Sequence, residues 1–172
     1  MKKTNAMRIL ESLDIKYEVL SYDWDEEHLD AVHASHSAGL PSEQVYKTIV
    51  MQNSDNEVFV FCLPADFSIS LKKARSLTSS KVLNLIKLEN LLSLTGYIRG
   101  GCSPLGMKKH FPTFVEELAL LQEHIYVSAG LRGFQLKITP EDLVKAAQAR
   151  FADFTELSEK PTIFNRGMKA TK

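Results

Sequence analysis

The chain has 172 residues, with 21 acidic and 21 basic side chains, so its formal net charge is zero. An apolar share of 44% and a charged share of 24% are those of an ordinary globular domain of one core. No apolar run approaches the roughly 18 residues that span a bilayer, and two cysteines are too few for a disulfide framework. We therefore expect a cytoplasmic protein with reduced thiols and no membrane association.

Elements of the first half follow from hydrophobic spacing and turn residues. They are a helix around 7–13, a strand at 17–22, a short helix at 29–38 and two strands at 47–52 and 58–63. Asn5 is a candidate N-cap of the first helix, and Gly39 ends the second. The polar link 53–56 between the two β-rich runs predicts a hairpin.

The second half alternates helices and strands less regularly. It is predicted to contain helices at 71–77 and 87–94, strands at 125–128 and 134–138, and a helix from 139 to about 150. Ser70 and Thr139 are candidate N-caps, Pro140 suits the first helical position, and Gly96 closes a helix. We expect one α+β domain over residues 1–156, a mixed sheet with helices packed on it, and a polar tail at 157–172.

Charge is segregated along the chain. Residues 11–43 carry nine acidic side chains against Lys16 alone, whereas residues 70–110 carry eight Lys or Arg against Glu89 alone. The basic stretch suits an anionic partner, of which nucleic acid is one candidate; an ordinary solvated surface is the alternative. Because the whole chain is neutral, we expect weak, salt-sensitive binding to nucleic acid that could need a helper protein.

A glycine-rich loop is the most informative segment. Gly96, Gly100, Gly101, Pro104 and Gly106 fall within eleven positions, just before Lys108-Lys109. Glycine allows left-handed turns and lets another molecule lie directly against the main chain. Exposed amides of such a loop can hold a phosphate or stabilise an oxyanion. A structural turn after the helix is the alternative interpretation.

Other chemistry finds less support in the residues. His33 and His36 share a predicted helix face with Asp30, but no further ligand is near in sequence and no HExxH pattern occurs, so no metal and no cofactor are predicted. Cys102 and Ser103 lie in the loop without a recognisable activating histidine. Lys47 begins a predicted core strand, where an ammonium could enter a cleft or simply solubilise the strand end.

Six segments, in order, resemble the YbaK/EbsC family of freestanding aminoacyl-tRNA deacylases, closest to its Cys-tRNA deacylase branch. They are Lys47-Thr-Ile-Val, Leu63-Pro-Ala-Asp, Leu71-Lys-Lys-Ala, residues 95–106, Val127-Ser-Ala-Gly-Leu-Arg-Gly and Thr139-Pro-Glu-Asp-Leu. The resemblance covers about residues 5–150. It implies a fold similar to the editing domain of prolyl-tRNA synthetase, a mixed sheet or partly closed barrel flanked by helices.

The resemblance also implies a reaction. Family members hydrolyse the ester between a wrong amino acid and tRNA, acting in trans, because binding alone separates similar small amino acids poorly. The expected substrate is Cys-tRNA(Pro) and also Cys-tRNA(Cys), bound by its acceptor end, with prolyl-tRNA synthetase as a candidate partner. The alternatives are a deacylase for another small amino acid, such as alanine on tRNA(Pro), and a non-catalytic module that binds RNA or a partner protein.

Site residues are carried over by position. Lys47 matches the strand lysine implied to anchor the phosphate or aminoacyl end of the substrate. The implied pocket residues are Gly100, Gly101, Cys102, Ser103 and Pro104 of the loop, with Tyr22, Ser128, Arg132 and Asp142. Asp142 has helix capping as an equal alternative, and Tyr22 has core packing.

In the Cys-tRNA branch the resemblance implies that the thiol of the substrate attacks its own ester carbonyl, giving a cyclic thioester and tRNA. The protein would then orient the thiol and stabilise the oxyanion through amides of the loop. Cys102 is expected to be structural and to form no covalent bond with substrate.

Overall fold

A computed structural model describes residues 2–158. Its helices are α1 (Asn5–Ser12), α2 (Ala31–Ala38), α3 (Leu71–Thr78), α4 (Leu88–Thr95) and α5 (Pro140–Ala147), with a 3-10 helix η1 (Glu117–Leu121). Its strands are β1 (Glu18–Ser21), β2 (Tyr46–Asn53), β3 (Val58–Pro64), β4 (Phe67–Ile69), β5 (Leu83–Leu85), β6 (Thr113–Glu116), β7 (Ile125–Ser128), β8 (Phe134–Ile138), β9 (Arg150–Ala152) and β10 (Thr155–Leu157). The tail beyond residue 158, predicted to be polar, lies outside the described residues.

The strands form three sheets, which confirms the expected α+β class. The largest has the order β5-β2-β3-β6-β9 and is mixed, because β3–β6 and β6–β9 are parallel while the other pairs are antiparallel. A second sheet, β1-β8-β7, is antiparallel, and β10 pairs with β4. Over residues 2–158 the largest sheet keeps open edges at β5 and β9, so the expected mixed sheet is present and does not close into a barrel.

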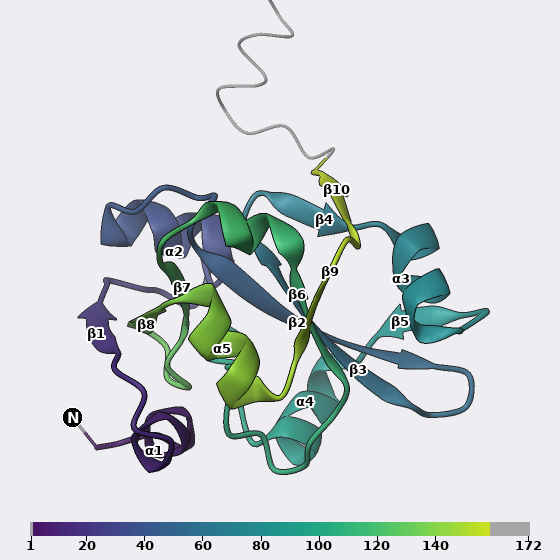
Figure 1. The fold of residues 1–172 in the computed structure, drawn as a ribbon, viewed down its shortest axis with the longest axis horizontal. Helices are drawn as coiled ribbons and strands as arrows, with labels where there is room; N and C mark the ends of the chain where they lie inside the picture. Colours follow the sequence, from purple (N-terminus) through teal and green to yellow (C-terminus); the bar gives the residue numbers. More distant parts are fainter. Residues whose placement is uncertain (1, 159–172) are drawn as a thin grey trace, which may run out of the picture.

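The central hairpin was correctly predicted. β2 and β3 pair from Tyr46↔Pro64 to Gln52↔Val58, with the polar link as the turn. Side chains alternate between the two faces of such a strand. Met51 of β2 packs on one face with Phe61 and Phe114, while Val50 packs on the other with Val60 and Phe111. Both faces of the hairpin are therefore buried, and in Figure 1 the hairpin crosses the centre of the molecule, with α3 and β5 at one side and β1, β7 and β8 at the other.

Helix boundaries depend on caps that the sequence shows only in part. The hydroxyls of Ser70 and Thr139 accept hydrogen bonds from Lys73 N and Asp142 N, as predicted for N-caps. Thr4 rather than Asn5 caps α1, because Thr4 is extended and its hydroxyl accepts from Met7 N. The last helix ends earlier than predicted, because Gln148 adopts a left-handed conformation with φ 51°.

Several short strands escaped prediction. β4, β5, β9 and β10 have three residues each, too few to show an alternating pattern. The turn between β9 and β10 is fixed instead by a distant carboxylate. Glu116, only 1% exposed, accepts from Phe154 N, Thr155 N and Thr155 Oγ1 at 3.1, 3.1 and 2.6 Å. No helix in the described part of the chain is long and apolar enough to cross a membrane.

Candidate functional site

The glycine loop after α4 is held as a closed unit. Thr95 starts it, with its carbonyl accepting from Lys108 N at 3.0 Å and its hydroxyl accepting from Tyr97 N at 3.0 Å. The buried hydroxyl of Tyr97 donates to the carbonyl of Leu105 across the loop, and burial raises the pKa of Tyr97 to about 12. Bonds at both ends and across the middle hold this segment in one conformation.

Gly100 sits at the tip of a turn that the sequence left undefined. Gly101 N donates to Ile98 O at 3.0 Å, closing a four-residue turn in which Gly100, with φ 85°, has the third position. A positive φ at that position is the requirement of a type II turn. The Gly101 amide is thus engaged in the turn, whereas the amides of Gly100 and Cys102 make no hydrogen bond to any of residues 2–158. Of these three amides, those of Gly100 and Cys102 are therefore the ones that remain available to a ligand.

The turn packs against the connection between β7 and β8. A Cβ on Gly101 would lie 3.1 Å from Arg132 N and 3.2 Å from the carbonyl carbon of Leu131. A Cβ on Gly100 would lie 3.0 Å from Leu29 Cδ2 and 3.4 Å from the Arg132 side chain. Arg132 Nε in turn donates to Arg99 O at 2.8 Å. The structure thus brings Gly100, Gly101 and Arg132 together, as expected from the resemblance.

Lys47 and Ser128 lie on neighbouring strands and on one face. Val45 forms a parallel bridge with Tyr126, and both side chains pack in the same apolar cluster, which also contains Ala65. Lys47 follows Val45 by two residues and Ser128 follows Tyr126 by two, so strand alternation puts both on the side of that cluster. Lys47 Nζ accordingly donates to Ala65 O at 3.0 Å. Ser128, the neighbour of Lys47 on this face, directly precedes the β7–β8 connection, whose residues Leu131 and Arg132 contact Gly100 and Gly101.

The side chain of Cys102 does not share the face of Lys47. Its side chain packs with Val50, Val60 and Phe111, on the opposite face of the β2–β3 hairpin. Burial raises the pKa of the Cys102 thiol to about 12, with a smaller lowering by a hydrogen bond to Thr95, so the thiol stays protonated at neutral pH. A protonated thiol is a poor nucleophile. The structure therefore gives no support to Cys102 as a side chain that contacts substrate.

Ser103 and Pro104 are enclosed in the loop. Both are buried, and Ser103 Oγ accepts from Leu105 N at 3.3 Å. The Ser103 hydroxyl therefore faces the interior of the loop. The structure therefore gives these two residues a place in the packing of the loop, and neither lines the groove described below.

Tyr22 contacts the β7–β8 connection, whereas the carboxylate of Asp142 makes no hydrogen bond or ion pair with it. Tyr22 N donates to Gly133 O at 2.8 Å, and burial raises the pKa of its hydroxyl while a backbone hydrogen bond from Gly133 lowers it. Tyr22 is thus beside the Arg132 connection. Asp142 lies in the first turn of α5, where its amide is capped by Thr139, and its carboxylate makes no hydrogen bond or ion pair with residues 2–158.

Trp24 is a contact that sequence reasoning missed. The guanidinium carbon of Arg132 lies 5.3 Å from the centre of the Trp24 ring, a cation–π distance. A Cβ on Gly133 would lie 2.7 Å from Trp24 Cδ1, so the ring covers this glycine closely. Arg132 is therefore held from two sides, by the ring and by Arg99 O. An isolated tryptophan in an acidic segment gave no signal of this contact.

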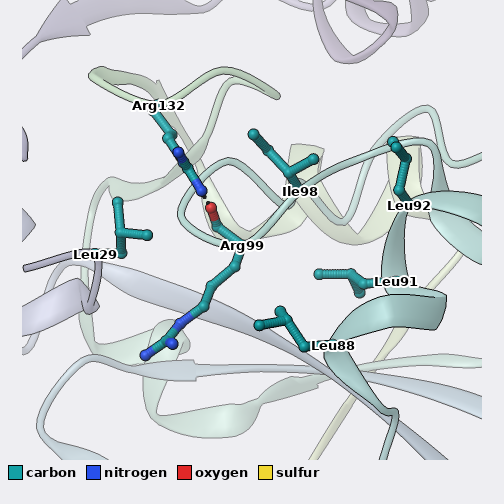
Figure 2. A pocket seen from close by; sticks show the side chains of 7 residues that line it. All are labelled: Leu29, Leu88, Leu91, Leu92, Ile98, Arg99 and Arg132. Atoms are coloured by element: carbon teal, nitrogen blue, oxygen red, sulfur yellow. Dashed lines mark hydrogen bonds between the residues drawn. The ribbon is translucent and has the colours of Figure 1, made fainter. Parts of the chain in front are cut away.

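A groove of about 260 Å³ opens beside the glycine loop. Aliphatic side chains and two arginines line it: Leu29, Leu88, Leu91, Leu92, Ile98, Arg99 and Arg132. Figure 2 shows the Arg99 side chain running between Leu29 on one side and Leu88 and Leu91 on the other, with Arg132 above. Since Arg99 and Arg132 also contact the Gly100 turn, the groove and the turn share a wall.

Two of the five histidines, His28 and His33, pair with nearby aspartates. Asp25 Oδ1 bonds His28 Nδ1 at 2.9 Å, and Asp30 contacts His33 in the same way. Desolvation acts to raise the pKa of the Asp25 carboxyl, but the hydrogen bonds from His28 and from the Glu27 amide together lower it. Within residues 2–158, no three His, Cys, Asp or Glu side chains gather in a way that could hold a metal ion.

Comparison with known proteins identifies the family and agrees with the fold. Residues 25–146 match the aminoacyl-tRNA editing domain, so the chain belongs to that family, as the resemblance in its motifs predicted. A relative from Enterococcus faecalis, EbsC, is 38% identical over 154 residues, covering 90% of this chain and 94% of that protein. Its name proposes a Cys-tRNA(Pro)/Cys-tRNA(Cys) deacylase.

Two solved structures share the fold. A hypothetical protein, APE2540, matches with a TM-score of 0.80 and 20% identity, over 89% of this chain and all of that one (100%). A protein described as a candidate trans-editing enzyme for prolyl-tRNA synthetase matches with a TM-score of 0.74 and 22% identity, over 91% of this chain and 99% of that one.

Proposed function

We propose that this protein is a trans-acting deacylase that removes cysteine from Cys-tRNA(Pro), and also from Cys-tRNA(Cys). The observation that supports the proposal is the side-by-side placement of β2 and β7, with Lys47 and Ser128 on one face, together with the contact of the connection after Ser128 with Gly100. Membership in the aminoacyl-tRNA editing family and the name of the 38% identical relative support it.

The reaction needs no nucleophile from the protein. The substrate thiol adds to the carbonyl carbon of its own ester, the carbon–oxygen bond to the ribose breaks, and the departing ribose oxygen takes up the thiol proton. The products are a cyclic thioester and tRNA. Holding the thiol and the carbonyl in contact supplies most of the acceleration, because intramolecular attack depends on orientation.

Two groups of this chain would act on the carbonyl. The Gly100 and Cys102 amides can donate to the oxyanion that forms, and preorganised amides are strong stabilisers because they need no rearrangement during the reaction. The Lys47 ammonium would anchor the aminoacyl end or the adjoining phosphate, and Ser128, Tyr22 and Arg132 would border the pocket. Prolyl-tRNA synthetase is the partner that would deliver the tRNA, compensating for the zero net charge of the chain.

A panel of charged tRNAs tests the proposal. Cys-, Ala- and Ser-charged tRNA(Pro) and Cys-tRNA(Cys) are incubated with the protein, with and without prolyl-tRNA synthetase, and release of the amino acid is followed. We expect the two Cys-tRNAs to be hydrolysed at least tenfold faster than the others. Faster hydrolysis of Ala-tRNA(Pro) would show that the substrate is Ala-tRNA(Pro) and not a Cys-tRNA. Binding of tRNA without turnover of any member of the panel would show that the protein is a non-catalytic module.

Replacing Cys102 by alanine tests the absence of covalent catalysis. We expect the rate of Cys-tRNA hydrolysis to stay within about threefold of wild type, because the thiol is protonated and faces the opposite side of the hairpin. The free energy of unfolding should fall by about 1 kcal/mol, as for the loss of one buried group. Complete loss of turnover with unchanged thermal unfolding would instead make Cys102 a participant in the chemistry.

A further inference from the structure

The groove beside the glycine loop has walls that are unusually apolar for exposed surface. Leu88 is 61% exposed, Leu92 52% and Ile98 45%. These large aliphatic side chains line one hollow instead of being scattered singly over the surface. A contiguous exposed apolar patch in a soluble domain marks a binding site more often than scattered residues do.

The cationic side chain of Arg99 lies among these apolar side chains. The Arg99 guanidinium makes no hydrogen bond or ion pair with any of residues 2–158, although it runs along the groove between Leu29 and Leu88 (Figure 2). An arginine fork binds phosphate oxygens well, and guanidinium planes also stack on nucleobases. Aliphatic walls with such a cation suit a ligand that has a flat, weakly polar body and one anionic group.

The position of the groove restricts that ligand further. Arg99 directly precedes Gly100, and Arg132 both lines the groove and contacts the Gly100 turn. In an aminoacyl-tRNA the ester is carried by the ribose of the terminal adenosine, so the base of that nucleotide lies one sugar ring away from the reacting carbonyl. If the carbonyl is bound at the Gly100 turn, the base must occupy a surface directly beside it.

We propose that the groove binds the 3′-terminal adenosine of the acceptor strand, with adenine between the aliphatic walls and the adjoining 5′ phosphate on Arg99. This inference rests on the proposed function and adds the nucleotide subsite to it. A volume of about 260 Å³ suits a single nucleoside, since pockets for larger ligands run from about 300 to 1,000 Å³.

Binding of short oligonucleotides to the full chain tests the subsite without requiring turnover. The probes are the trinucleotide CCA and the same oligonucleotide with an abasic 3′ residue, titrated by fluorescence anisotropy up to about 1 mM, the range of weak complexes. The variants are Leu92→Glu in the groove and Arg99→Ala. Leu121→Glu is the matched control, because Leu121 is 78% exposed and does not line the groove.

We expect wild type to bind CCA at least tenfold more tightly than the abasic probe, as burial of one ring system predicts. Leu92→Glu should lose at least tenfold for CCA, and Arg99→Ala should weaken both probes to a similar degree because it removes a phosphate contact. Leu121→Glu should behave as wild type. Thermal unfolding should be unchanged in all three variants, since each site is exposed.

Equal affinity for the two probes, no binding of CCA, or a Leu92→Glu variant with wild-type affinity would each overturn the subsite. A Leu92→Glu variant that binds CCA normally but no longer binds prolyl-tRNA synthetase would also overturn the subsite. That result would make the groove a protein-docking surface. Failure of the charged-tRNA panel is a separate result, because it removes the deacylase proposal even where CCA binds in the groove as expected.

Discussion

Replacing Lys47 by alanine is expected to lower the kcat/KM for Cys-tRNA by about 100- to 1,000-fold, the effect of removing one preorganised charge from a reacting carbonyl. Lys47 Nζ donates to Ala65 O at 3.0 Å, so its ammonium is positioned before substrate arrives. The measurement is the initial rate of deacylation at subsaturating Cys-tRNA.

Two further substitutions separate charge from packing at this position. Lys47→Met keeps a long aliphatic chain without the charge and should be as inactive as Lys47→Ala. Lys47→Arg keeps the charge in a planar group and should retain part of the activity. The loss of one hydrogen bond to a carbonyl should cost no more than about 1.5–3 kcal/mol in the free energy of unfolding. Activity of Lys47→Met within threefold of wild type would end the anchoring role.

Gly100→Ala is expected to lower kcat/KM by about 100-fold and to destabilise the fold by about 1–2 kcal/mol. The new Cβ would require φ 85° of a residue that rarely adopts it, and would press on Leu29 and Arg132. Relief requires the turn to move, and a displacement of about 1 Å at a reacting group can cost about 100-fold in rate. Deacylation rates and thermal unfolding of the purified variant measure the two effects.

Gly39→Ala provides the matched control. Gly39 has φ 70° at the end of α2, and a Cβ there would meet no atom within 4 Å. The Gly39→Ala variant therefore has the same backbone strain as Gly100→Ala, but its new Cβ presses on no neighbour. We expect a similar loss of stability and wild-type activity. Equal activity losses in the two variants would show that global destabilisation, rather than displacement of the Gly100 turn, explains the effect.

The glycine loop shows which features of the candidate site could be predicted from the sequence. The glycines at 96 and 100 were recognisable as backbone positions, and both have positive φ. The hydrogen-bond partner of each amide was not recognisable: Gly101 N donates to Ile98 O, so the amides available for the proposed donor role are those of Gly100 and Cys102. A hydrogen bond between residues three apart depends on the turn type, which several glycine-containing sequences can adopt.

For β2 and its neighbour β7, too, the sequence predicted the strand but not its surroundings. The alternation of β2 predicted a strand that begins near Lys47, and motif order identified the family to which the chain belongs. The neighbour of that strand end was unpredictable, because Val45 and Tyr126 are 81 positions apart and meet through one parallel bridge. The exposed groove was missed for the same reason, since its walls come from α4, the glycine loop, Leu29 and Arg132.

The amino-acid sequence by itself determined the order of the main helices and strands, the caps at Ser70 and Thr139, and the family. These depend on local periodicity, on side chains within four residues, or on contiguous motifs. Only the tertiary structure decided the three-residue edge strands, the face that each of Lys47 and Cys102 occupies, and the contact of Trp24 with Arg132. Such features arise from pairing between distant segments, where register and burial, rather than local preference, set the outcome.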